Sequence, residues 1–220
     1  MTPEPSSDCQ LCTRLVEFRA QCTSEHPDWF NGAVPSFGPE NARLLIVGLA
    51  PGMQGANRTG RPFTGDYAGD LLYETLDLFG FSEGKYASDP DDGLILKDCM
   101  ITNAVRCLPP QNKPTAAEIN TCREFLVDRI AALPNLRAIV ALGRIAHDAT
   151  VVALGQKKSA VTFGHGARHV LPHPGQDSGQ SSDIHLFDSY HCSRYNTNTG
   201  RLTAEMFRQV FKDVQACLQD

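Results

Sequence analysis

The chain has 220 residues, of which 41% are hydrophobic and 20% are charged, and its formal net charge is −5 at pH 7. This composition is typical of a folded globular protein and excludes a disordered or collagen-like chain. The longest apolar run, Leu44 to Ala50, is far shorter than the roughly 20 residues that span a bilayer. The N-terminus has no basic start and no apolar stretch, so it does not resemble a secretory signal. We therefore expect a cytoplasmic protein without a membrane span.

Apolar periodicity predicts helices and short buried strands that alternate along the chain. The expected helices are Arg14 to Cys22, Tyr67 to Phe79, Thr115 to Leu133, Arg144 to Leu154 and Thr203 to Leu218. The expected strands are Leu44 to Leu49, Asp98 to Val105, Arg137 to Leu142 and His185 to Ser189. This order indicates one α/β domain over residues 1–220, with residues 1–8 flexible and helices on both faces of a mainly parallel, four-stranded sheet. Ligands bind such sheets outside the carboxyl ends of the strands.

The charged residues are unevenly distributed. Residues 41–65, 99–117 and 189–204 contain no Asp or Glu but do contain Arg or Lys. Each of these stretches begins in or near an expected strand, so we expect all three to share one edge of the sheet. There they would form a positive surface on an acidic protein, as phosphate binding requires.

The chain has eight cysteines, which in a cytoplasmic protein favour metal or redox chemistry over disulfides. Cys9 and Cys12 form a C-x2-C pair, and Cys107 and Cys122 can complete a four-thiolate site if the fold brings them together. Iron–sulfur and zinc are both compatible with these ligands. We expect the other four to be small buried side chains: Cys22, Cys99, Cys192 and Cys217.

A glycine-rich loop follows the first strand, and its glycines let the backbone approach a ligand closely. Gly55 to Pro62 imitates a P-loop, but Arg61 and Pro62 stand where Lys and Ser/Thr would hold phosphate and magnesium. Phe63 either stacks on a planar base or fills the core between sheet and helix. Asp66 is expected to cap the following helix, a role that does not exclude catalysis.

Two further loops carry polar side chains. Asn103 ends a strand, where its amide can pair with a base edge or can bind the loop backbone. His191 directly follows another strand and can donate a hydrogen bond to charge that develops on a leaving group. His165, His169 and His173 would align on a helix, but Gly166 and Pro172 argue against a helix there, so we expect no zinc site within this segment.

Taken together, the loops closely resemble the motifs of the family 5 uracil-DNA glycosylases. The similar strings are GLAPGMQGANRTGRPFTGD at 48–66, TNAVRCLPPQNKPT at 102–115, SYHCSRYNTNTGRLT at 189–203 and, for the strand and helix between them, RAIVALGRIAHDA at 137–149. The resemblance implies a monomeric, monofunctional glycosylase that removes uracil, and hypoxanthine or other deaminated bases, from duplex DNA. It also implies a central four-stranded parallel sheet and a structural [4Fe–4S] cluster held by Cys9, Cys12, Cys107 and Cys122.

The resemblance, with the chemistry of base excision, assigns roles to the loop residues. Asp66 stabilises the cationic sugar or orients the attacking water, and His191 bonds the departing base. The flipped base is held by Gly52, Phe63 and Asn103. The residues expected to contact DNA are Arg58, Arg61, Ser193, Arg194, Tyr195 and Asn196.

Two other functions compete with this interpretation. A nucleotide-phosphate hydrolase could use the glycine-rich loop, but the P-loop lysine is missing. A non-catalytic iron–sulfur electron carrier is the second alternative, but it gives the three polar loops no function.

Overall fold

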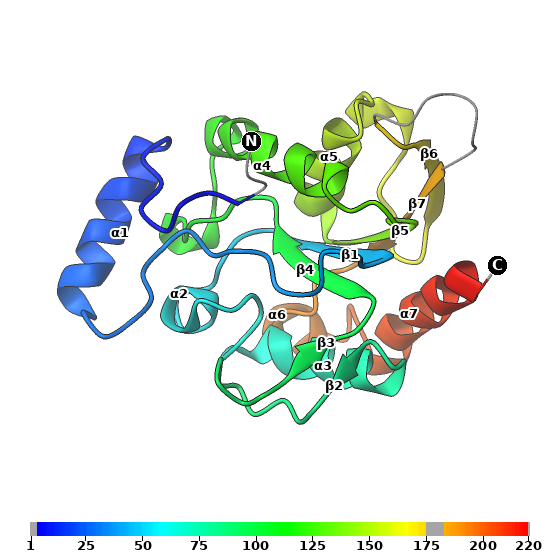
Figure 1. Ribbon diagram of the computed structural model, residues 1–220, viewed down its shortest axis with the longest axis horizontal. Coiled ribbons are helices and arrows are strands. Elements are labelled where there is room, and N and C mark those ends of the chain that lie inside the picture. The colour runs from blue at the N-terminus through cyan, green and yellow to red at the C-terminus, as the bar shows by residue number, and fades with distance from the viewer. Residues whose placement is uncertain (1–3, 175–182, 220) are drawn as a thin grey trace.

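A five-stranded sheet forms the centre of the protein in the computed structural model, which describes residues 4–174 and 183–219 (Figure 1). Its strand order is β4-β1-β5-β7-β6. The bounds are Leu44–Gly48 for β1, Cys99–Asn103 for β4, Ala138–Leu142 for β5, Arg168–Pro172 for β6 and Asp183–Ser189 for β7. The first four neighbours in this order pair in parallel, whereas β6 pairs antiparallel with β7. The α/β class is confirmed, but the prediction of four strands is wrong.

The fifth strand, β6, has little hydrophobic signal because it lies at the edge of the sheet. Of its five residues only Leu171 is buried, and it ends at Pro172. Edge strands tolerate proline and exposed polar side chains, since only one side is paired. By contrast, every residue of β1, β4 and β5 is buried, and these strands are mostly apolar, so the sequence predicts them.

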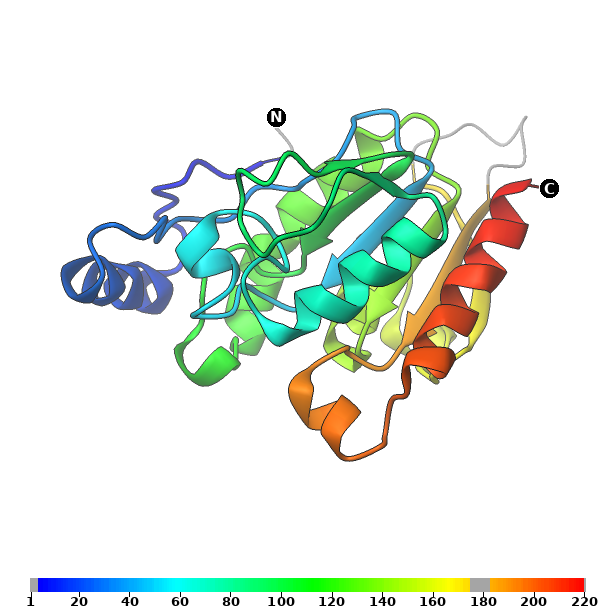
Figure 2. The same ribbon diagram turned by 90° about the horizontal axis from the view of Figure 1, so that it is seen from below.

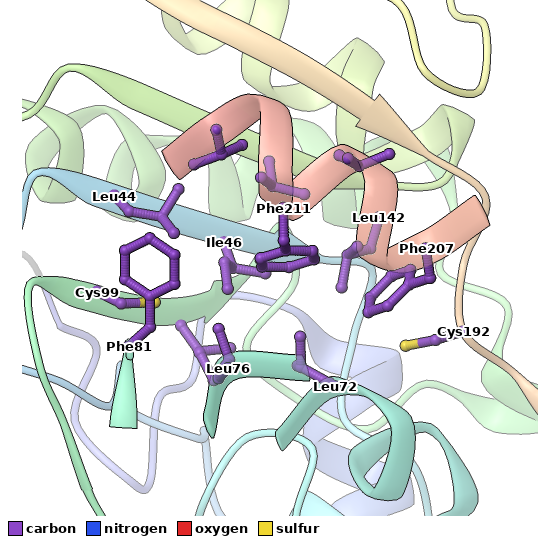
Figure 3. Packing of buried hydrophobic residues seen from close by; sticks show 14 of the residues in the cluster. Leu44, Ile46, Leu72, Leu76, Phe81, Cys99, Leu142, Cys192, Phe207 and Phe211 are labelled. Atoms are coloured by element: carbon purple, nitrogen blue, oxygen red, sulfur yellow. The ribbon is translucent and has the colours of Figure 1, made fainter. Parts of the chain in front are cut away.

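Helices cover both faces of the sheet (Figure 2). One face packs on α3 (Tyr67–Leu78) and α7 (Ala204–Gln219), and the other on α4 (Ala116–Ala131) and α5 (Arg144–Ala153). Side chains alternate along β1: Leu44 and Ile46 contribute to the first core, and Leu45 and Val47 to the second. In Figure 3, Leu72 and Leu76 of α3 face Phe207 and Phe211 of α7, with Ile46 nearby.

Smaller elements complete the fold. They are α1 (Thr13–Glu25), α2 (Ala56–Thr59), α6 (Arg194–Asn198), the two-stranded sheet of β2 (Ser82–Glu83) and β3 (Ile95–Leu96), and two single 3-10 turns at Pro110–Asn112 and Lys158–Ala160. None of the helices in the described part of the chain combines the length and the apolar character of a membrane span.

The N-terminal segment is fastened to the body of the protein. Glu4 forms ion pairs with Arg106 at 2.9 Å and with Arg129 at 2.5 Å, and both guanidinium groups are buried. A buried guanidinium needs a paired carboxylate, so this contact orders the segment. The flexibility expected for residues 1–8 stays a prediction, and residues 1–3 lie outside the described residues.

The parallel pairing places three loops at one edge. Gly48 of β1 pairs with Asn103 of β4, and Leu142 of β5 pairs with Ser189 of β7. Because these are all carboxyl-terminal residues of parallel strands, the loops that follow β1, β4 and β7 begin side by side. This is the edge at which α/β sheets bind ligands.

The packing of α7 predicts a large effect of Phe211→Ala. Phe211 is fully buried between α7 and the sheet. We expect the free energy of unfolding to fall by about 3–5 kcal/mol, because the substitution removes buried surface and leaves a cavity. Urea denaturation followed by circular dichroism measures it. Leu78→Ala, at a side chain that is 61% exposed on α3, is the control and should change stability by less than about 0.5 kcal/mol. Equal effects of the two substitutions would contradict this packing.

Candidate active site

A cleft opens at the carboxyl edge of the sheet. Its walls come from the loop after β1, the loop after β4 and the loop after β7, so the three predicted loops do meet. Of the predicted site residues, the cleft is lined by Gly52, Phe63, Asp66, Asn103, His191, Ser193 and Arg194. Tyr67 and Asn112 also line it and were not predicted as site residues.

The end of β4 places Asn103 at the cleft. The side chain is almost fully buried, and among the described residues its Oδ1 atom has no hydrogen-bond partner. A Cβ on Gly48 would lie 2.3 Å from this oxygen and 2.7 Å from the Phe63 ring, so only glycine leaves room for both. A buried acceptor without a partner costs about 1–3 kcal/mol, and a ligand that carries an N–H group can satisfy it.

Phe63 packs in the core, which is one of its two predicted alternatives, and its stacking on a base stays a prediction. It is 7% exposed and packs in the core beside α3, yet it also lines the cleft. Its backbone φ is 55°, in the left-handed region that side-chain-bearing residues seldom adopt. The ring stacks on His191 with 5.9 Å between the ring centroids. The flat face of this pair is suited to a planar ligand.

Asp66 is the N-cap of α3, as predicted. Its Oδ1 accepts a hydrogen bond from Gly69 N at 3.2 Å. The Oδ2 atom is directed toward Gly52 and Gly55, where an added Cβ would lie 3.0 and 2.3 Å away. These glycines therefore make space for the carboxylate, and burial raises its pKa.

His191 also lines the cleft, in the loop that follows the end of β7. Burial lowers its pKa to about 4, so the imidazole is neutral at neutral pH. Its backbone is held because Asn196 Nδ2 donates to the His191 carbonyl at 2.8 Å. The next residue, Cys192, donates its thiol to Ala68 O on α3 at 3.3 Å. This contact ties the His191 loop to the helix that Asp66 caps.

The short helix α6 presents the remaining polar residues of this loop. Ser193 is its N-cap, and Tyr195 is 73% exposed. The Arg194 guanidinium lies 5.2 Å above the ring of Tyr67, at the rim of the cleft. Arg58 is exposed on α2. The amide of Asn196 is used internally and holds His191, so its role is in part structural.

The position of Arg61 contradicts its predicted role as a DNA contact. The side chain is only 6% exposed, and its two Nη atoms donate to the Asp92 carboxylate at 2.8 Å. This pairing holds the pKa of Asp92 well below its usual range. Arg61 therefore fixes the loop from inside. The partner carboxylate lies 31 residues away and cannot be identified from the local sequence.

The predicted positive surface is correspondingly smaller. Like Arg61, two more arginines of the carboxylate-free stretches are paired: Arg43 with Asp98 at 2.7 Å, and Arg106 with Glu4. Both carboxylates come from outside those stretches. Of the exposed basic residues, Arg194 lines the cleft, and Arg58 lies on α2 in the loop after β1.

A second, smaller pocket is lined by Cys9, Cys12, Cys107 and Cys122. Burial raises the pKa of the Cys107 thiol to about 11 and that of Cys122 to about 12. Arg106 N donates to Cys122 Sγ at 3.3 Å, and the Arg19 guanidinium lies 3.8 Å from Cys107 Sγ. These donors stabilise the thiolate form and oppose part of the effect of burial on the two pKa values.

The spacing of these four sulfur atoms bears on which metal they can hold. No three of them lie within 4.8 Å of one another, a statement that covers the described residues. Four thiolates on one zinc ion would lie about 3.8 Å apart, given Zn–S bonds of about 2.3 Å. The other four cysteines, Cys22, Cys99, Cys192 and Cys217, are buried, as predicted.

Comparison with known proteins agrees with the site. The family described as the uracil DNA glycosylase superfamily matches residues 35–215. A type-5 uracil-DNA glycosylase of Thermus thermophilus is 46% identical over 94% of this chain and 92% of its own length. A type-5 uracil-DNA glycosylase of Pyrobaculum aerophilum is 38% identical over 95% of this chain and 88% of its own length. A type-4 uracil-DNA glycosylase of Sulfurisphaera tokodaii is 30% identical over 92% of this chain and 78% of its own length. This chain belongs to the uracil DNA glycosylase superfamily.

Proposed function

We propose that this protein is a DNA-repair glycosylase that hydrolyses the N-glycosidic bond of uracil in DNA. The relatives named uracil-DNA glycosylases support the activity. The observation that carries the substrate assignment is the unpartnered, buried Oδ1 of Asn103 in a cleft that also contains Phe63, Asp66 and His191. A phosphate hydrolase is not favoured, because the glycine-rich loop forms only a single helical turn and Arg61 is buried. An electron carrier is not favoured, because the relatives are named as glycosylases.

The Asn103 amide accounts for base selection. Uracil offers an N–H donor at N3 beside an oxygen acceptor at C4, which matches an acceptor at Oδ1 and a donor at Nδ2. Cytosine has a bare nitrogen at N3, which would leave Oδ1 unsatisfied and repelled. Hypoxanthine presents the same donor and acceptor pair as uracil, so the amide also accommodates it. A base in a duplex must first leave the stack, and Phe63 then supports its ring.

The chemistry follows from charge. Cleavage leaves positive charge on the deoxyribose and negative charge on the base. The neutral His191 imidazole donates an N–H to the departing base, and the Asp66 carboxylate stabilises the sugar cation or orients the attacking water. Because Asp66 keeps one oxygen on the helix cap, the other remains available to the sugar or the water.

Duplex DNA is the proposed partner. Arg58 and Arg194 are exposed near the cleft and can each contact a phosphate. Tyr195 is exposed on the protruding helix α6, and its proposed role is to enter the minor groove beside the vacated position.

Cys9, Cys12, Cys107 and Cys122 are the proposed ligands of a [4Fe–4S] cluster. Their shared cavity and wide sulfur spacing support a cluster over a single zinc ion. When bound, the cluster supplies a covalent cross-link. These residues thereby connect the start of α1, the loop after β4 and α4. None of the four lines the cleft, which is consistent with a structural role.

The first prediction concerns Asn103→Ala. We expect uracil excision to slow by about 10- to 100-fold, which corresponds to about 1–3 kcal/mol for the lost base contact. Release of free uracil from a U·G duplex under single-turnover conditions measures the rate. Asn112→Ala is the matched control, since its exposed amide lines the same cleft. Full activity of the Asn103 variant would remove this amide from base recognition.

A second prediction concerns Asp66→Asn. Asparagine caps helices as well as aspartate does, so this substitution removes the charge and keeps the cap. We expect excision to fall at least about 100-fold, within the usual range for a positioned acid or base. The thermal midpoint of unfolding should stay close to that of the wild type.

The pH profile tests the same residue. The active form of Asp66 is ionised and its pKa is raised, so the wild-type rate is lost as pH falls through that raised pKa. With a pKa of about 4, His191 adds no transition near pH 6.5. An acidic limb that persists unchanged in Asp66→Asn would rule Asp66 out as its source.

A third prediction concerns Cys12→Ser. We expect this variant to lose bound iron, acid-labile sulfide and visible absorbance, because a cluster ligand is removed. Cys99→Ala, at a buried cysteine in β4, is the control and should keep all three. Wild-type protein that contains stoichiometric zinc in place of iron would refute the cluster.

A further inference from the structure

Three side chains from separate elements meet on the face of the sheet that packs on α4 and α5. They are His147 of α5, His169 of β6 and Asp188 of β7, and their potential ligand atoms all lie within 4.8 Å of one another. Asp188 follows Ile184 and Leu186 on the side of β7 that belongs to the second core. The side chains of His147 and Asp188 are 1% and 0% exposed, whereas His169 is 15% exposed and opens the cluster to solvent.

The Asp188 carboxylate needs a cation. Within residues 4–174 and 183–219, its ion-pair partners are the two histidines and no Lys or Arg. Its Oδ1 lies 2.7 Å from His147 Nδ1, and its Oδ2 lies 3.2 Å from His169 Nε2. An isolated carboxylate in this apolar setting is costly unless a positive charge accompanies it.

The surroundings of His147 limit where that charge can reside. Its Nε2 lies 3.4 Å from the Val161 carbonyl oxygen, and its Nδ1 faces the carboxylate, so both ring nitrogens face acceptors. A neutral imidazole has a single N–H group. If a neutral His147 donates from Nε2 to Val161, its Nδ1 presents a lone pair to the carboxylate, and the positive charge that both groups then need is either a second proton on the ring or a bound metal ion. A metal-bound histidine commonly donates its other N–H to a backbone carbonyl in this way.

We propose that His147, His169 and Asp188 form a binding site for a zinc-class divalent cation. Two imidazole nitrogens and one carboxylate oxygen are a ligand set that zinc accepts, with a fourth position left for water. Ligand atoms around tetrahedral zinc lie about 3.3 Å apart, so the 2.7 Å contact must open by roughly 0.6 Å. Gly164 N already donates to Asp188 Oδ2 at 3.2 Å and orients the carboxylate. The ion would fasten the edge strand β6 to β7 and α5.

Metal analysis of the intact protein tests this site. Wild-type protein equilibrated with zinc sulfate and then desalted should retain about one zinc ion per chain by mass spectrometry, with its iron content unchanged. Zinc should also raise the thermal midpoint of unfolding. X-ray absorption at the zinc edge should show nitrogen and oxygen ligands at about 2.0–2.2 Å and no sulfur at about 2.3 Å.

Two variants and one control locate the ion. His169→Ala removes a ligand at the sheet edge, and Asp188→Asn preserves the shape of the side chain but removes its charge; both should lose the retained zinc. His185→Ala, three residues before Asp188 on β7 and bonded to Arg168, should keep it. The proposal would be overturned by a sulfur shell in the zinc spectrum or by zinc retention in both variants. It would also be overturned if the wild type retained no zinc, in which case a proton on His147 is the counter-charge of Asp188.

Discussion

The absence of a side chain at Gly48 is the constraint on which the candidate active site depends. Gly48 pairs with Asn103 at the ends of two parallel strands, and any Cβ there would collide with the Asn103 amide and with Phe63. Those two side chains thus share the space above one glycine. Farther along the same loop, Gly52 and Gly55 leave space for Asp66 in the same manner. Backbone without side chains lets one small cleft contain an amide, an aromatic ring and a carboxylate.

The distribution of charge explains how an acidic protein can suit DNA. Its net charge of −5 provides no general attraction for phosphate. Three arginines of the carboxylate-free stretches, Arg43, Arg61 and Arg106, serve the fold, because each is paired with a carboxylate from elsewhere in the chain. DNA contact is left to a few exposed groups around the cleft. This arrangement favours shape and base recognition over bulk electrostatics.

The sequence predicts most of the fold because the central strands are mostly apolar and the main helices have one apolar face. It misses β6, whose single buried residue leaves no pattern, and α6, which is too short for periodicity. The convergence of Asp66, Asn103 and His191 follows from parallel strand order. The role of Arg61 does not, because its partner Asp92 becomes a neighbour only in the folded chain. The histidine cluster also depends on three distant elements, whereas the local spacing from His165 to His173 pointed away from metal.

The central claim is that the cleft holds a single everted uracil, read by Asn103 and supported by Phe63. The most direct measurement is a crystal structure of the Asp66→Asn protein bound to a duplex with one U·G mismatch. The account predicts uracil N3 within hydrogen-bond distance of Asn103 Oδ1 and the uracil ring stacked on Phe63. A uracil that remains in the helical stack, or that lies in the cleft with Asn103 Oδ1 still unpartnered, would contradict it.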